Sequence, residues 1–365
     1  MRITTCVRRL EAYVPGEQPK ARNVVKLNTN ENPYPPSPAC GRVLGRFVLD
    51  RLRRYPDPLF TELRAELAKL NRTTPERIFV GNGSDEILAL AAKAFVEDDE
   101  LIGSLDPSYS LYKTLAAIRN VKWAGFDRDR LLSAAADGSR APKALDGSRK
   151  LALFLWTNPN APTGEFAEPK AVSAFARRFP GVVLVDEAYA DFARANCMAL
   201  ATAKANRNVL VMRTFSKSYS LAGLRVGYCV GPKDLVDALY KVKDSYNVDA
   251  VAQAVALAAV RDQRWMKANV AKVVRTRARF TAELGRRGWD VLPSESNFVF
   301  ARPPEGEGPR AAELFASLRE RNIFVRYFKG PLTGDRLRIT IGTDAQMKKL
   351  LKALDSIRKP PKKSR

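Results

Sequence analysis

The chain has 365 residues, 45% of them hydrophobic and 28% charged, values typical of a soluble globular protein with one large or two ordinary domains. It contains no histidine, which excludes Ser-His-Asp triads, Cys-His pairs and histidine metal centres. The net charge of +23 fits a nucleic-acid-binding protein or an enzyme with a basic surface, and we favour the enzyme because the basic residues are scattered and no nucleic-acid-binding motif is present.

Cysteine spacing and hydropathy indicate the cellular compartment and the kinds of site to expect. Cys6, Cys40, Cys197 and Cys229 are scattered without CxxC spacing, so we expect reduced thiols and no metal site. No apolar run reaches the roughly 20 residues of a membrane span, and the N-terminal sequence lacks the apolar core of a secretory signal. We therefore expect a cytoplasmic protein with no membrane or nucleic-acid partner. The basic sequence at 359–365 predicts a disordered tail.

The first two thirds of the chain alternate between helical and strand patterns. Residues 18–40 are rich in Pro and Asn and predict an extended arm. Short apolar runs between helical patterns are typical of buried parallel strands. Strands are expected near 78–81, 100–106, 151–156, 182–188 and 209–215, and helices near 61–71, 86–96, 108–119 and 170–179. The pattern predicts an α/β fold with a mostly parallel central sheet covered on both faces.

After about residue 250 the pattern changes. One long helical stretch is predicted over 251–288. Strand patterns within 289–303, 322–328 and 336–342 then alternate with helical patterns at 311–322 and 344–359, which predicts a smaller α+β domain. The resulting division has an N-terminal arm at 1–44 joining the small domain, a large domain at 45–255, and the small domain at 256–358.

Polar or aromatic residues follow each strand predicted in the large domain. The segments are GNGSDE (81–86), DPSY (106–109), TNPNAPTG (157–164), DEAY (186–189) and FSK (215–217). Each alone has an ordinary explanation, such as a turn or a helix cap. Sites in open α/β sheets gather at the carboxyl ends of the strands, so five such segments together predict one site there.

One end of this predicted site is suited to a phosphate group. Ser84 and Asp85 begin a helix whose first N–H groups can hold an anion. Thr214, Ser216 and Arg225 supply hydroxyls and a guanidinium that suit the same anion.

The remaining residues suit an aromatic aldehyde. Tyr109 offers a ring for stacking, and Asp186 lies in an apolar run where a buried carboxylate needs a cation, such as a pyridinium nitrogen. Tyr189 can hydrogen-bond a phenolic oxygen. Lys217 would form a Schiff base, with its pKa lowered by burial and by a cation such as Arg225; the alternative is a surface lysine in a turn. Pyridoxal 5'-phosphate (PLP) combines all these features.

Motifs along nearly the whole chain resemble those of the fold-type-I PLP-dependent aminotransferases, and most closely those of the histidinol-phosphate aminotransferase family. The most specific is SKSYSLAGLRVGY at 216–228, supported by NPNAPTG and DEAY, whereas GNGSDE alone is weak. The others are LNTNENPYPPSP, RRYPDP, PSYSLY, SESNFVF, IFVRYF and LRITIG.

The resemblance implies further roles. Lys217, Asp186 and Tyr189 become the catalytic residues, in a large domain that binds PLP. Tyr55 matches a tyrosine that reaches the cofactor phosphate of a neighbouring subunit, which implies a homodimer with shared active sites. Arg338 matches an arginine that binds the carboxylate of the amino donor.

The substrate side carries three further matches. Arg326 matches a position near the anionic end of the substrate, with strand-surface charge as the alternative. Tyr13 and Asn297 match other substrate-side positions. One position departs from the family pattern: Ala161 stands where an asparagine usually contacts the ring oxygen of the cofactor. Asn158 or Asn160 would replace that contact, or Tyr189 would act alone.

The implied reaction is transamination between L-histidinol phosphate and 2-oxoglutarate, yielding imidazole acetol phosphate and L-glutamate in histidine biosynthesis. Aromatic aminotransferases and threonine-phosphate decarboxylases share the scaffold and remain alternatives. A basic PLP-fold module that binds nucleic acid or regulates another protein is the non-enzyme alternative.

Overall fold

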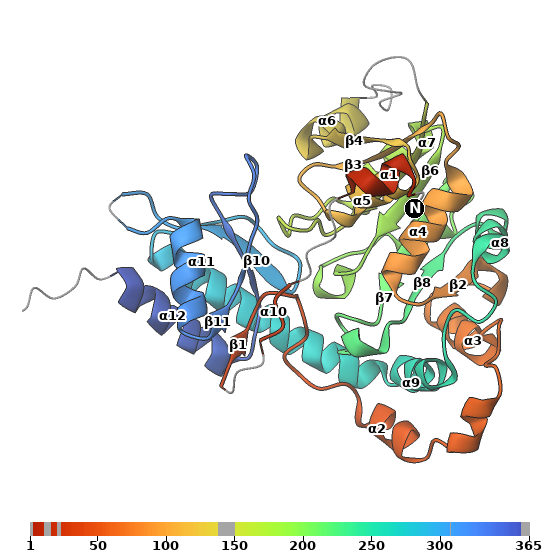
Figure 1. Ribbon diagram of the computed structural model, residues 1–365, viewed down its shortest axis with the longest axis horizontal. Coiled ribbons are helices and arrows are strands. Elements are labelled where there is room, and N and C mark those ends of the chain that lie inside the picture. Colours follow the sequence, from red (N-terminus) through yellow and green to blue (C-terminus); the bar gives the residue numbers. More distant parts are fainter. Residues whose placement is uncertain (1–2, 11–15, 20–22, 138–149, 307, 359–365) are drawn as a thin grey trace, which may run out of the picture.

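The protein is represented by a computed structural model that describes residues 3–10, 16–19, 23–137, 150–306 and 308–358 (Figure 1). Tyr13 and the predicted tail at 359–365 lie outside the described residues. No helix in the described ranges is long and apolar enough to cross a membrane. Within the same ranges, no cluster of three or more potential metal ligands occurs, and all four cysteines are free thiols.

A seven-stranded sheet forms the centre of the larger part of the molecule. Its order is β2-β8-β7-β6-β5-β3-β4, and every neighbouring pair is parallel except the two that involve β8. The predicted mostly parallel sheet is confirmed. The strands are β2 (Ile78–Gly81), β3 (Leu101–Leu105), β4 (Lys122–Phe126), β5 (Leu151–Thr157), β6 (Val182–Asp186), β7 (Val209–Thr214) and β8 (Gly227–Val230).

Two of these strands were absent from the sequence prediction. β4 is an edge strand with an exposed first residue, so its sequence KWAGF has no continuous apolar run. β8 is only four residues long and begins at Gly227, although all four residues are buried. Short strands of this kind are set by pairing with their neighbours more than by local sequence.

Helices cover both faces of the central sheet. They are α3 (Thr61–Leu70), α4 (Ser84–Phe95), α5 (Leu111–Ile118), α6 (Arg128–Asp137), α7 (Pro169–Arg178), α8 (Lys233–Val242) and α9 (Ala250–Arg261). Because strand side chains alternate, Phe154 and Trp156 pack in one hydrophobic cluster while Leu153 and Leu155 pack in another. Burial on both faces explains why the strands read as unbroken apolar runs.

The smaller part is built on a four-stranded antiparallel sheet of order β12-β13-β10-β9. Its strands are β9 (Asp290–Val291), β10 (Phe298–Arg302), β12 (Arg326–Tyr327) and β13 (Leu337–Thr340), and its helices are α10 (Gln263–Arg286), α11 (Ala311–Glu320) and α12 (Asp344–Arg358). The single helix predicted over 251–288 is wrong. Asp262 ends α9, and its side chain accepts a hydrogen bond from the backbone N–H of Trp265, which caps α10.

The N-terminal arm joins this smaller part. Its strand β1 (Val25–Lys26) pairs in parallel with β11 (Ile323–Phe324), and Figure 1 shows the two strands side by side. The remaining short elements are α1 (Thr5–Arg9), α2 (Pro38–Gly45), η1 (Leu49–Arg53), η2 (Pro75–Arg77), η3 (Ala190–Phe192), η4 (Met198–Ala201) and η5 (Ala222–Leu224).

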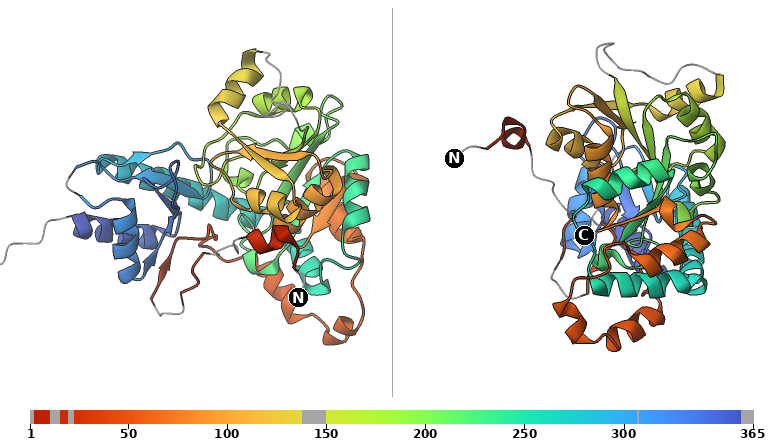
Figure 2. Two further views of the ribbon diagram at one scale, coloured as in Figure 1. Left: turned by 45° about the horizontal axis from the view of Figure 1, so that its top comes forward. Right: turned by 90° about the vertical axis from the view of Figure 1, so that its right-hand side faces the viewer.

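Helix α10 runs from the larger part to the smaller part in Figure 1, and the left view of Figure 2 shows the two parts side by side. Its early residue Met266 packs in a cluster with the central sheet, whereas Phe280 and Leu284 pack with the smaller sheet. The division into domains stays a prediction. This packing supports a boundary inside α10, later than residue 255.

Candidate active site

A cavity of about 530 Å³ lies where the carboxyl ends of the central strands face the smaller part. It gathers most of the residues that were proposed from the sequence. Those lining it are Ser84, Asp85, Tyr109, Asp186, Tyr189, Thr214, Ser216, Lys217, Arg225, Arg326 and Arg338. Strand ends far apart in the sequence therefore meet in one cavity.

One end of the cavity is a cationic and hydroxylic cup at the start of α4. Gly83 precedes the helix with a φ of 82°, and a Cβ there would lie 2.7 Å from Nη2 of Arg225, so glycine lets the guanidinium lie against the helix start. Arg225 also pairs with Asp85 at 3.3 Å and donates to Oγ of Ser216 at 3.4 Å. The Thr214 hydroxyl donates to Ser216 at 3.0 Å. This arrangement suits a phosphate group.

Asp186 is a buried carboxylate at the end of β6. It accepts hydrogen bonds from the Tyr112 hydroxyl at 2.8 Å and from the Ala188 N–H at 3.0 Å. Burial raises its pKa to about 6 although both hydrogen bonds act in the opposite direction. No residue in the described ranges forms an ion pair with it. A cationic ring nitrogen in the cavity would supply the missing partner, which is the strongest fit of this site to PLP.

Lys217 lies three residues beyond β7 and reaches into the same cavity. Its Nζ donates to the carbonyl of Thr29 at 3.3 Å and lies 5.8 Å from the centre of the Tyr189 ring. Burial lowers its pKa to about 8, helped first by Arg338 and to a smaller extent by Arg225. The lowered pKa increases the neutral fraction of the amine near physiological pH, and nucleophilic attack and proton acceptance require the neutral form.

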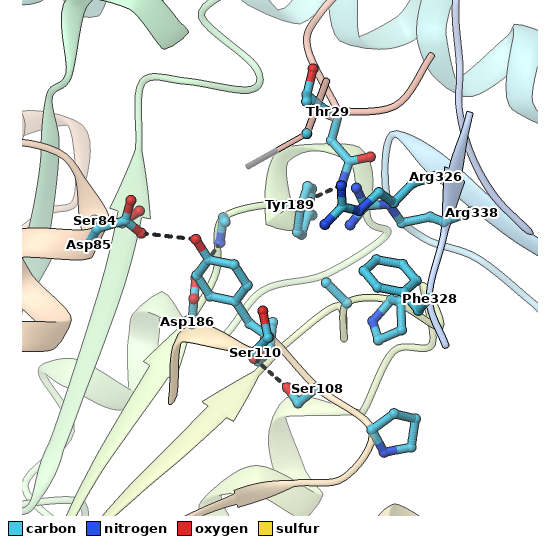
Figure 3. A pocket seen from close by; sticks show the side chains of 18 of the residues that line it. Thr29, Ser84, Asp85, Ser108, Ser110, Asp186, Tyr189, Arg326, Phe328 and Arg338 are labelled. Carbon is cyan, nitrogen blue, oxygen red and sulfur yellow. Dashed lines mark hydrogen bonds between the residues drawn. The ribbon is translucent and has the colours of Figure 1, made fainter. Parts of the chain in front are cut away.

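Two arginines form the wall opposite the phosphate-type cup. Arg326 and Arg338 are paired in register on β12 and β13. Their guanidinium carbons lie 5.3 and 5.2 Å from the centre of the Phe328 ring. Figure 3 shows both arginines on the side of the cavity away from Ser84 and Asp85. The cavity thus has a cationic centre at each end.

Three predicted asparagines do not line the cavity. The side chain of Asn158 makes two hydrogen bonds with the backbone of Ala167, at 2.8 and 2.9 Å. Asn160 donates to the carbonyl of Pro107 at 2.9 Å, and Asn297 donates to that of Asn30 at the same distance. These amides brace loops around the site, and their direct contact with a ligand stays a prediction.

Two other positions also stand apart from the cavity. Tyr55 is 79% exposed and stacks on Tyr246 with ring centres 4.3 Å apart, so it does not face the cavity of its own chain. Its predicted role toward a neighbouring subunit stays a prediction. Ala161 does line the cavity, where its methyl group leaves no side-chain amide.

The structure adds residues that sequence reasoning missed. Tyr112 is fully buried and holds Asp186, although in the sequence it reads as an ordinary apolar position of a helix. Asn30 lies in the N-terminal motif LNTNENPYPPSP, and its Nδ2 donates to the hydroxyl of Tyr189 at 2.9 Å. No local signal reveals either contact, because both join segments that are distant in the chain.

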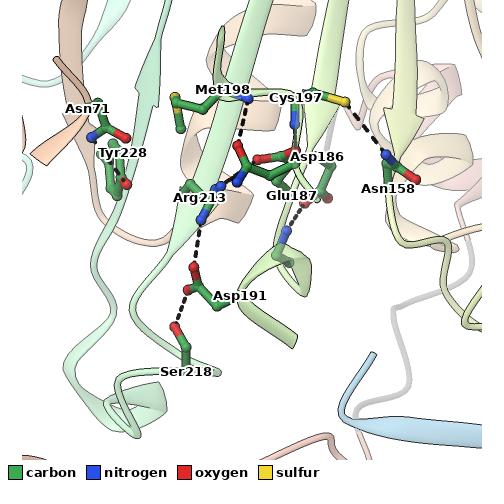
Figure 4. A network of polar contacts seen from close by, with 12 residues as sticks. Asn71, Asn158, Asp186, Glu187, Asp191, Cys197, Met198, Arg213, Ser218 and Tyr228 are labelled. Carbon is green, nitrogen blue, oxygen red and sulfur yellow. Dashed lines mark hydrogen bonds and ion pairs between the residues drawn. The ribbon is translucent and has the colours of Figure 1, made fainter. Parts of the chain in front are cut away.

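A network of ion pairs and hydrogen bonds around Arg213 holds the segments that carry Asp186 and Lys217 (Figure 4). Arg213 donates to Glu187 at 2.8 Å and to Asp191 at 2.7 Å. Asp191 also accepts a hydrogen bond from the Ser218 hydroxyl. The Glu187 side chain is fully buried. Since Glu187 follows Asp186 and Ser218 follows Lys217, the network fixes both segments that carry the central residues.

Comparison with known proteins agrees with this geometry. The family model for aminotransferase class I and II matches residues 22–354. Histidinol-phosphate aminotransferase from Geobacter sp. (strain M21) is 42% identical over 94% of this chain and 95% of its own. The protein of the same name from Syntrophotalea carbinolica is 43% identical over 95% and 97%.

A solved structure is similar in fold. Histidinol-phosphate aminotransferase from Sinorhizobium meliloti, in complex with pyridoxal-5'-phosphate, superposes with a TM-score of 0.83 at 24% identity, covering 98% of this chain and 97% of that one. The cavity places Lys217 and Asp186 at the strand ends, as the fold of the aminotransferases requires. The relatives are more than 40% identical over nearly the full length of the chain. The chain belongs to the class I and II aminotransferases, in the histidinol-phosphate aminotransferase family.

Proposed function

We propose that the protein is a PLP-dependent aminotransferase that transfers the amino group of L-histidinol phosphate to 2-oxoglutarate, yielding imidazole acetol phosphate and L-glutamate. The observation that carries the proposal is the arginine pair Arg326 and Arg338, in register on neighbouring strands and lining the same cavity as Lys217. A phosphate monoester carries about 1.5 to 2 negative charges at pH 7 and is bound best by more than one cation.

The cup at the start of α4, with Arg225, would hold the phosphate of the cofactor. Asp186 would bind the ring nitrogen, and the ring of Tyr109 would stack on the cofactor. When bound, PLP supplies an electron-withdrawing ring that weakens the C–H bond beside the substrate amino group. Asp186 favours the cationic ring because a buried carboxylate without a counter-charge is destabilised.

Lys217 carries the proton chemistry in this proposal. Its neutral Nζ would accept the proton from the substrate carbon that bears the amino group and would deliver it to the cofactor carbon that is bonded to the same nitrogen. The pKa of about 8 suits that task, because a base works best when its pKa lies near the working pH. Tyr189, which lies close to Nζ, orients the phenolic oxygen of the cofactor by a hydrogen bond.

The arginine pair also explains how one cavity accepts two substrates in turn. Histidinol phosphate carries a phosphate and 2-oxoglutarate carries carboxylates. A guanidinium group can bind either oxyanion through two hydrogen bonds. Both substrates can therefore place an anionic end at Arg326 and Arg338 and their reacting carbon near Lys217.

We further propose a homodimer with shared active sites. Large apolar side chains are exposed on and around α2 and η1, at Leu44, Val48, Leu49, Leu52 and Leu59. An exposed apolar group of this size is typical of a protein interface. The exposed Tyr55 lies in the same segment and would reach the cofactor phosphate of the partner.

Complementation tests the shared site directly. Lys217→Ala should be inactive and Tyr55→Ala weakly active, but mixed dimers would contain one site with both residues intact. Random mixing in equal amounts makes half of the dimers mixed, so about a quarter of wild-type activity should return. No recovery after subunit exchange, verified by a tag on one variant, would reject shared sites.

The four free thiols fit the cytoplasm, which is the compartment we propose.

The substrate is tested by adding single amines to the yellow PLP-loaded protein without an acceptor. Histidinol phosphate should bleach the visible band at a lower concentration than phenylalanine or O-phosphothreonine. A preference for phenylalanine would identify an aromatic aminotransferase, and release of carbon dioxide from phosphothreonine a decarboxylase. Absence of any band after adding PLP, together with salt-sensitive DNA binding, would favour a nucleic-acid-binding protein.

A further inference from the structure

Three consecutive residues of the N-terminal arm each contact one residue of the predicted machinery. The carbonyl of Asn28 accepts a hydrogen bond from Nη2 of Arg338 at 2.8 Å, and that of Thr29 accepts one from Nζ of Lys217 at 3.3 Å. The side chain of Asn30 donates to the Tyr189 hydroxyl at 2.9 Å. We call residues 28–30 the strap.

The amide of Asn30 is held in one orientation. Its Oδ1 accepts a hydrogen bond from the Thr340 hydroxyl at 3.0 Å, and that hydroxyl accepts one from the Asn30 backbone N–H at 3.0 Å. With Oδ1 facing the Thr340 hydroxyl, Nδ2 points to the hydroxyl of Tyr189. Asn30 is 1% exposed, and its carbonyl is bound by Asn297. A φ of 55° also favours asparagine here over most other residues.

The direction of this hydrogen bond determines where the tyrosine proton points. Because Nδ2 can only donate, the Tyr189 oxygen accepts, and the O–H of Tyr189 has to be directed to a different acceptor. The neighbouring position that could place a second amide in the cavity is occupied by Ala161. Asn158 and Asn160 donate from their amides to the backbone carbonyls of Ala167 and Pro107, and neither asparagine lines the cavity.

We propose that Asn30 is a positioning residue that acts through Tyr189. It keeps the tyrosine oxygen as an acceptor on the strap side, so the O–H donates into the cavity, toward the phenolic oxygen of bound PLP. The proposal rests on the PLP site of the proposed function and is independent of which amine reacts. It also makes Thr340, on β13, part of the support for Tyr189.

The cofactor band of the loaded protein provides the test. Its absorbance changes with pH as the nitrogen that Lys217 contributes loses its proton. A hydrogen bond donated by Tyr189 to the phenolic oxygen competes with that proton, so weakening the bond should raise the titration midpoint. In Asn30→Asp the carboxylate still accepts from Thr340 but draws the tyrosine proton toward itself. We expect a rise of about one pH unit, the equivalent of one hydrogen bond to a charged group.

Asn28→Asp is the matched control for charge. It places the same charge two positions away on the strap, where the Asn28 side chain donates to the Glu17 carbonyl and makes no bond to Tyr189. Its midpoint shift measures the electrostatic part alone. Equal shifts in the two variants would overturn the proposal.

A cycle with Ala161→Asn separates positioning from a merely structural role. The new amide of Ala161→Asn should lower the titration midpoint much more in Asn30→Asp than in the wild type. The reason is that residues 30 and 161 would both affect the hydrogen bonding of the same phenolic oxygen of PLP, residue 30 through the Tyr189 hydroxyl. Additive shifts would reject the proposal.

If the Asn30→Asp variant does not fold, Thr340→Val, which frees the Asn30 amide to rotate, should raise the midpoint. A protein without any band would instead reject PLP binding, and a normal band with unreactive histidinol phosphate would reject only the substrate.

Discussion

Replacing Lys217 with methionine should make the apoprotein more stable at neutral pH. The pKa of this lysine falls from an ordinary value of 10.5 to about 8 on folding, mainly by burial. A base whose pKa is lowered in the folded state destabilises the fold wherever it is protonated, below pH 8, and the effect disappears as the pH rises past the unfolded value. Methionine has a similar length and no charge.

The size of the effect follows from the pKa difference. Each pKa unit corresponds to about 1.4 kcal/mol, so the full difference amounts to about 3 kcal/mol at pH 7. At pH 10 the folded amine is neutral and the unfolded amine partly so, and less than about 1 kcal/mol remains. The gain in stability should therefore shrink steeply between pH 7 and pH 10.

Urea unfolding of the PLP-free protein at the two pH values measures this difference. Lys93→Met is the matched control, since Lys93 is an exposed lysine on α4 without a hydrogen bond in the described residues. That variant should change stability by less than about 0.5 kcal/mol at either pH. A gain in Lys217→Met that is equal at pH 7 and pH 10, or a loss at pH 7, would refute the reasoning. The variant should also be inactive.

Three further substitutions probe separate parts of the site. Asp186→Asn should lower kcat about 100-fold or more and weaken PLP binding without lowering the melting temperature of the apoprotein; an active variant would exclude Asp186 as the partner of the ring nitrogen. Arg213→Met should cost about 3 to 5 kcal/mol in urea unfolding because Glu187 would be left buried and unpaired, and adding Glu187→Gln should recover part of the loss. Arg326→Gln should raise KM for histidinol phosphate about tenfold or more; an equal rise for phenylalanine would contradict a phosphate-binding role.

The sequence was sufficient to predict the residues at the strand ends. Asp186 and Lys217 each follow a buried strand, and buried parallel strands are the easiest elements to recognise, because both of their faces are apolar. Since parallel strands end at a common edge, a position in the sequence could be translated into a position in space. Arg326 and Arg338 were found only through motif resemblance, because short strands carry little periodic signal.

Contacts between distant segments could not be predicted in this way. Asn30 and Thr340 are separated by 310 positions, and no local pattern relates them. Tyr112 donates to Asp186 from helix α5, and nothing in the sequence of that helix distinguishes Tyr112 from an ordinary buried residue. For Asn158 and Asn160 the motif predicts proximity to the site, but the direction of each side chain depends on loop carbonyls that only the folded backbone positions.

The pairing of β1 with β11 also bears on how the protein is made. Residues 25 and 26 leave the ribosome early, but their partners at 323 and 324 emerge about 300 residues later. At roughly 5 to 20 residues per second, the first strand waits on the order of 15 to 60 seconds with its backbone groups unpaired. A nascent chain that already contains Lys217 and Tyr189 still lacks Thr340, to which the Asn30 amide is bound. Catalytic competence should therefore arise only when synthesis is nearly complete, and chains released early should carry an exposed strand edge that chaperones or proteases can recognise.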